Sequence, residues 1–116
     1  MGGNEVTVLR SDIFVALTQL RLLSISFMQL TTIPYDLFAN LTKLNILVLS
    51  GNLLSVLPPG IFSFLSNLTS LYLNLNNLST VDARWFVQSP HMGLLGLLDL
   101  TQNSISKIEL NMHNFW

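Results

Sequence analysis

Few side chains in this sequence could carry out catalysis or bind a metal. The chain has no Cys, which excludes disulfides, thiolate zinc sites and Cys nucleophiles. Its two histidines, His91 and His113, are far apart, and neither has a second ligand at metal-binding spacing. The acidic residues are scattered and no Gly-rich phosphate loop follows a predicted strand, so neither a carboxylate pair nor a nucleotide site is evident. We therefore predict a protein that is not an enzyme and has no metal or cofactor.

Three Asn side chains could instead be modified. Asn40, Asn67 and Asn77 each begin an N-x-[ST] sequence, the acceptor signal for N-linked glycosylation. A chain this rich in Asn, Ser and Thr would contain about two such sequences by chance, so their number is weak evidence. Their placement adds support, because all three fall outside the apolar interior predicted below.

The composition predicts one domain with a large buried fraction. The chain has 116 residues, of which 50% are hydrophobic and only 9% charged, against roughly 25% charged in an average globular protein. This balance excludes intrinsic disorder. A formal net charge of −1 without clusters of either sign lacks the electrostatic footprint of a nucleic-acid or anionic-membrane binder. Every apolar stretch is shorter than the roughly 18 residues that span a bilayer, and the first residues do not resemble a signal peptide.

A 24-residue repeat organises the chain. The clearest unit, residues 44–67, reads LNILVLSGNLLSVLPPGIFSFLSN. Its apolar spacing recurs in the units before and after it, and once more behind an insertion within VQSPHMGL. We expect this insertion on the convex side, either as a harmless loop or as a contact for a partner. The prediction is one domain, residues 1–116, divided into a partial repeat 1–19 and repeats 20–43, 44–67, 68–94 and 95–116.

Each repeat predicts a short strand, a turn and an irregular return. Alternation along the strand points Leu47 and Leu49 into the interior and their neighbours outward. An Asn follows the strand, where its amide can satisfy backbone groups that the turn leaves unpaired. Pro34 and Pro58 suit a descent that is not a strand, because proline has no N–H to donate. The recurring residues predict a buried ladder of Asn4, Asn52, Asn76 and Asn103 and a spine of Phe14, Phe38, Phe62 and Phe86.

Met28 stands where a further ladder Asn is expected. One interpretation is simple tolerance, with Met filling space as a soft apolar residue. The other is a local break in the ladder that leaves the turn amides to water or to Gln29.

The pattern LxxLxLxxNxL resembles the leucine-rich repeat family over the full length of the chain. This resemblance implies an α/β solenoid: a leucine-rich repeat horseshoe segment with a parallel β-sheet on the concave face and an irregular or 3-10 convex side. No repeat can bury its inner face alone, and neither end of the chain shows a polar capping unit. We therefore expect a segment that is uncapped at both ends and stacks on neighbouring repeats or caps.

The tail LPPGIFSFLSNL is similar to the typical extracellular animal repeat. The phrases NLTSLYLNLNNLSTV and LLDLTQNSISKI look most like a Toll-like receptor ectodomain, with variable lymphocyte receptors second. The resemblance implies a recognition module of an innate immune receptor, located outside the cell or at its surface. The alternatives are an adhesive or matrix leucine-rich repeat protein and an intracellular leucine-rich repeat scaffold.

The resemblance also places ligand contacts on the concave face, which consists of outward strand side chains. This face is apolar and nearly uncharged, which suits a protein or microbial ligand, although the stretch could also bind nothing. Tyr72 is the central hot-spot candidate of this face. Arg21 is the only cation at or beside the face, so a nucleic-acid ligand is not indicated. The predicted concave residues are Leu22, Ser24, Ser26, Ile46, Val48, Ser50, Ser70, Tyr72, Asn74, Leu97, Asp99 and Thr101.

Overall fold

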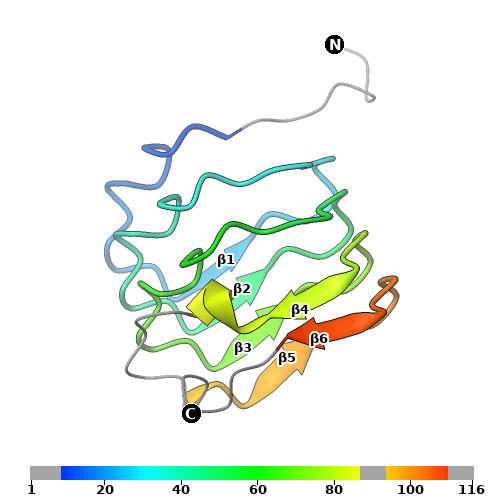
Figure 1. Ribbon diagram of the computed structural model, residues 1–116. Coiled ribbons are helices and arrows are strands. Elements are labelled where there is room, and N and C mark those ends of the chain that lie inside the picture. The colour runs from blue at the N-terminus through cyan, green and yellow to red at the C-terminus, as the bar shows by residue number, and fades with distance from the viewer. Residues whose placement is uncertain (1–8, 87–93, 110–116) are drawn as a thin grey trace.

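The computed structural model describes residues 9–86 and 94–109, and it shows a stack of coils that follow one another in sequence order (Figure 1). Each of the four coils from residue 20 onward contributes one short strand to a four-stranded parallel sheet of order β1-β2-β3-β5. The predicted solenoid with a parallel sheet on one face is therefore confirmed. The strands of this sheet are β1 (Leu22–Ser24), β2 (Ile46–Val48), β3 (Ser70–Tyr72) and β5 (Leu97–Asp99).

The register of the sheet aligns equivalent positions of successive repeats. Leu23 pairs with Leu47, Leu47 with Leu71, and Leu71 with Leu98. The last step is longer in sequence than the others, yet the register is kept. The inserted residues therefore do not disturb the sheet. They fall largely within residues 87–93, which lie outside the described residues, as does His91.

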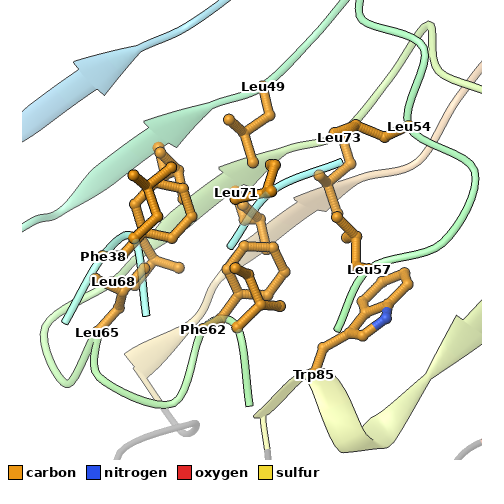
Figure 2. Close-up of a cluster of buried hydrophobic side chains, with 14 of the residues drawn as sticks. Phe38, Leu49, Leu54, Leu57, Phe62, Leu65, Leu68, Leu71, Leu73 and Trp85 are labelled. Atoms are coloured by element: carbon orange, nitrogen blue, oxygen red, sulfur yellow. The ribbon is translucent and has the colours of Figure 1, made fainter. Parts of the chain in front are cut away.

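The core lies between the sheet and the returning segments, and it is built from the repeated apolar positions. Leu47, Leu49, Leu71 and Leu73 are fully buried beneath the strands. Figure 2 shows Leu49, Leu71 and Leu73 above the ring of Phe62. The same few positions in each coil thus form one continuous core, as expected when a repeat buries its inner face only against its neighbours.

The phenylalanine spine runs through three successive coils. The rings of Phe38 and Phe62 stack with centroids 6.3 Å apart, and Phe86 lies 5.5 Å from Phe62 in a tilted arrangement. Trp85 meets the edge of Phe62 at 6.3 Å. Phe14 packs against the core cluster but is only partly buried, because it belongs to the first described coil.

The described part of the convex side consists of turns and 3-10 structure, including the helix η1 (Ala83–Phe86), and the described residues contain no α-helix. This irregular return agrees with the predicted fold class. Pro34 and Pro58 lie in segments of the return that form no strand, as their missing N–H groups require.

A second, two-stranded parallel sheet was not predicted from the sequence. It joins β4 (Thr80–Asp82) to β6 (Lys107–Glu109) on the descending part of the last two coils (Figure 1). Asp82 and Glu109 occupy the repeat position that Pro34 and Pro58 hold in the earlier coils. A strand therefore forms on the descent where proline is absent and the backbone N–H can pair.

Candidate functional site

The predicted concave residues lie on the four-stranded sheet and in the turns that follow its strands. Leu22 on β1 and Leu97 on β5 are the most exposed apolar residues of this face, at 55% and 41%. Between them, Ile46, Val48 and Tyr72 are half-buried by their neighbours. The sheet thus brings an apolar surface together from four coils, with its most exposed apolar groups at the two edges.

Polar side chains line this face where the strands end. Ser50 is only 9% exposed, and its hydroxyl lies 2.6 Å from the Asn74 side-chain oxygen, to which it donates a hydrogen bond. The Ser24 and Ser26 hydroxyls lie 3.2 Å apart. Of the predicted concave residues, Ser50 therefore contributes least to the accessible surface, which the sequence pattern alone did not indicate.

Asp99 is the one predicted concave residue that is charged at neutral pH. Its carboxylate accepts hydrogen bonds from the backbone N–H of Thr101 at 3.0 Å and from the Thr101 hydroxyl at 2.7 Å. These two bonds, the backbone bond foremost, lower the pKa of Asp99 below its ordinary value. The concave face thus carries a single negative charge at its β5 edge.

The asparagine ladder occupies the turns directly after the strands. The Asn52 side-chain oxygen accepts hydrogen bonds from the N–H groups of Met28 and Leu30 in the preceding coil, at 3.0 and 3.2 Å. Its amide donates to the carbonyls of Ile25 and Leu49, at 2.8 and 3.0 Å. One Asn thereby satisfies buried backbone groups in two coils, as complete pairing of buried polar groups requires.

The same pattern recurs in the next two coils. Asn76 accepts from Leu54 N–H at 3.1 Å and donates to the carbonyls of Leu49 and Leu73. Asn103 accepts from Leu78 N–H at 2.9 Å, and it likewise donates to a carbonyl of its own coil and to one of the coil before. The fourth predicted ladder residue, Asn4, lies outside the described residues.

The turn that carries Met28 differs from the others in backbone conformation. The equivalent first turn residue has a positive φ in all four coils, at Phe27, Gly51, Leu75 and Gln102. In the Met28 turn a second residue, Gln29, also has a positive φ, of 58°. Such a conformation is unfavourable for residues with a Cβ, so the turn that lacks its own ladder Asn has a distorted backbone.

A small pocket lies on the descending side, away from the concave face. Its volume is about 270 Å³, and it is lined by Val56, Pro58, Thr80, Trp85 and their neighbours. Arg84 forms an ion pair with Asp82 at 2.7 Å, and hydrogen bonds from the Arg84 side chain are the main cause that lowers the pKa of Asp82. The pocket opens where Pro58 cannot pair with β4, and backbone pairing between these coils resumes at Gly60, whose N–H donates to the Arg84 carbonyl at 2.7 Å.

Within residues 9–86 and 94–109, no three His, Cys, Asp or Glu side chains gather as a metal site would require. His113, like His91, falls in a part of the chain that the structure does not describe. The described residues also contain no helix long and apolar enough to cross a membrane.

The sequence that forms this repeated strand, ladder and spine matches the model of a known family. A leucine rich repeat family model matches residues 2–54 and 42–97. The chain belongs to the leucine-rich repeat family. No curated protein matches the sequence significantly. The leucine-rich repeat is a recognition fold, and this chain is a recognition module of that kind.

Solved structures show the same fold. A chain in the Toll–Spätzle complex from Drosophila is 31% identical to this chain, with a TM-score of 0.81 over 88% of this chain and 13% of that one. The leucine-rich repeat domain of APL1B is 25% identical, with a TM-score of 0.79 over 96% of this chain and 31% of that one. The TLR13–ssRNA13 complex is 24% identical, with a TM-score of 0.63 over 91% and 21% of the respective chains, and it shows the fold alone. The chain therefore spans less than a third of the length of each of these proteins.

Proposed function

We propose that this chain is part of the ectodomain of a Toll-like innate immune receptor and that its concave face binds a protein ligand. The similarity to a chain of the Toll–Spätzle complex supports the receptor assignment. A receptor ectodomain implies a location outside the cell or at its surface, and a role in binding without catalysis. The four parallel strands that align outward side chains into one apolar surface are the observation that carries the proposal.

Tyr72 is the centre of the proposed contact. It lies on β3 between Val48 of β2 and Asp99 of β5, its register partners on either side. A half-buried tyrosine offers apolar ring area at low cost in conformational entropy, and its hydroxyl can bond to a partner. The apolar residues around it would lose their remaining exposure on binding, which favours association.

The charge of this face favours a protein ligand over a nucleic acid. Nucleic-acid binding depends on several cations that neutralise phosphates. The predicted concave residues include no Lys or Arg, Arg21 is the only cation beside them, and Asp99 adds a negative charge. An RNA ligand, such as the one named with the TLR13 structure, is therefore disfavoured for this segment.

Site-specific photo-crosslinking tests the proposal. A photoreactive phenylalanine analogue replaces Tyr72 or, as a matched control, the exposed Tyr35 in the convex turns of the full chain, which is incubated with extracellular fluid from the source tissue. We expect a protein crosslinked from position 72 and absent from position 35. Binding of that identified protein should weaken about 30-fold in Tyr72→Ala, the scale of an interface hot spot, and should be unchanged in Tyr35→Ala.

Three kinds of result would contradict the receptor proposal. Equal crosslinking from both positions, or equal loss of affinity in both alanine variants, would remove the concave face as the contact surface. Capture of a second copy of this chain from position 72 would replace receptor function with adhesion. Capture of cytosolic proteins alone, from a matched cell extract, would favour the intracellular scaffold.

A further inference from the structure

The three possible glycosylation sites differ in what their side-chain amides do. The Asn67 amide donates a hydrogen bond to the Thr42 carbonyl at 2.8 Å, and the Asn40 amide donates to the Val15 carbonyl at 3.2 Å. In both pairs the carbonyl belongs to the preceding coil. These two exposed asparagines therefore link neighbouring coils through the side-chain nitrogen, the atom to which a glycan would be attached.

Asn77 is exposed, and its side chain makes no hydrogen bond within residues 9–86 and 94–109. Its position is fixed by the backbone instead, because its N–H donates to the Leu54 carbonyl at 2.9 Å. The next residue, Leu78, is fully buried and anchors the segment in the core. The Asn77 side chain is therefore exposed and can carry a substituent without losing a hydrogen bond to any described residue.

Two exposed leucines lie beside Asn77. Leu53 holds the same repeat position in the preceding coil and is 44% exposed, and Leu75, two residues before Asn77, is 39% exposed. Sugar rings have apolar C–H faces that can cover such side chains. An oligosaccharide on Asn77 would reduce the contact of these leucines with water.

We propose that Asn77 carries an N-linked oligosaccharide that covers Leu53 and Leu75, whereas the amides of Asn40 and Asn67 serve as links between coils. This inference rests on the proposed extracellular function, because the modification takes place in the secretory pathway. Asn77 lies five residues beyond the β3 residue Tyr72, in the turn that follows the strand. The glycan would therefore stand at the rim of the sheet and leave Tyr72 accessible.

Site occupancy in the secreted chain is the first test. The full chain is produced with a secretory leader, and peptides around each Asn are analysed by mass spectrometry before and after glycosidase treatment. We expect the Asn77 peptide to be the most fully glycosylated of the three, and Ser79→Ala to abolish its glycan. An unmodified Asn77 peptide, or higher occupancy at Asn40 or Asn67, would overturn the proposal. The leader directs secretion regardless of ligand binding, so this result is separate from the crosslinking result.

The second test separates the amide link from the acceptor signal. Thr42→Ala and Asn40→Asp both abolish the signal at Asn40, but only the second removes the donor to Val15. In bacterially produced chain, which has no glycan, Asn40→Asp should lower the folding equilibrium constant about threefold relative to Thr42→Ala, a modest hydrogen-bond effect. Equal stability of the two variants would show that the Asn40 amide has no linking role.

Discussion

Repeats 20–43 and 44–67 have the same core but different turns. In both, most of the equivalent apolar residues are buried, as Leu30 and Phe38 show in the first and Leu54 and Phe62 in the second. Leu20 and Leu23 of the first are only partly buried. Only the second has a ladder Asn, Asn52. The first has Met28, which is 40% exposed, followed by Gln29 with a positive φ. The apolar side chains are therefore buried in a repeat without its own ladder Asn, whereas the turn of that repeat differs in backbone conformation.

Repeat 20–43 keeps a closed turn because the ladder acts between coils. Asn52 accepts the N–H groups of Met28 and Leu30, so the second repeat satisfies the turn of the first. Each ladder Asn thus completes the coil before its own. A repeat that lacks its Asn can stay folded as long as the following repeat has one.

Removal of a spine ring should have the largest effect, because the spine is common to both repeats. Phe62→Ala deletes a buried ring that contacts Phe38, Trp85 and Phe86, and we expect a loss of about 4 kcal/mol in the free energy of unfolding. Phe14→Ala, at a half-buried position, is the matched control and should cost clearly less. Denaturant unfolding measures both. Equal losses would mean that the spine is not a continuous packing unit.

Removal of Asn52 should have the next largest effect and should act on the preceding repeat. Asn52→Ala leaves the buried N–H of Leu30 and the carbonyls of Ile25 and Leu49 without this partner, at a cost of about 3 kcal/mol. Hydrogen exchange of the Leu30 amide should become faster. Asn103→Ala, at a half-buried ladder position, is the comparison and should cost less. An unchanged exchange rate at Leu30 would contradict the coupling between coils.

The sequence predicted the parts of the fold that depend on period and polarity. Alternating leucines gave the strands and their register, because a strand must place every second side chain in the core. The recurrence of Asn52, Asn76 and Asn103 at the same position of successive repeats indicated the ladder, since an amide that follows a strand can both donate and accept. Neither inference needed a contact between distant residues.

Features that depend on contacts between coils could not be predicted in this way. The β4–β6 sheet forms because two descending segments without proline lie side by side, which a single repeat does not show. Ser50 occupies an outward position yet is buried, since it bonds to Asn74 of the next coil. The three glycosylation signals are also alike in sequence. Only the contacts that the amides of Asn40 and Asn67 make with the preceding coil distinguish them from Asn77.

Met28→Asn, which completes the ladder in repeat 20–43, should have the smallest effect on stability. It should also remove the difference in turn backbone between repeats 20–43 and 44–67. In repeat 44–67 the Leu49 carbonyl accepts two ladder amides, from Asn52 and Asn76, both at 3.0 Å. The equivalent Ile25 carbonyl accepts one, from Asn52 at 2.8 Å. Met28→Asn would supply the second donor, and we expect a gain of about 1 kcal/mol, the scale of one hydrogen bond.

The control for this gain is Met28→Leu, which keeps an apolar side chain and adds no amide, so it should leave the denaturant midpoint unchanged. If Met28→Asn raises the midpoint and Met28→Leu does not, the missing amide accounts for the distorted turn. If neither variant raises it, Asn52 alone already completes this turn. The positive φ of Gln29 would then be a tolerated local conformation and not the result of a missing ladder residue.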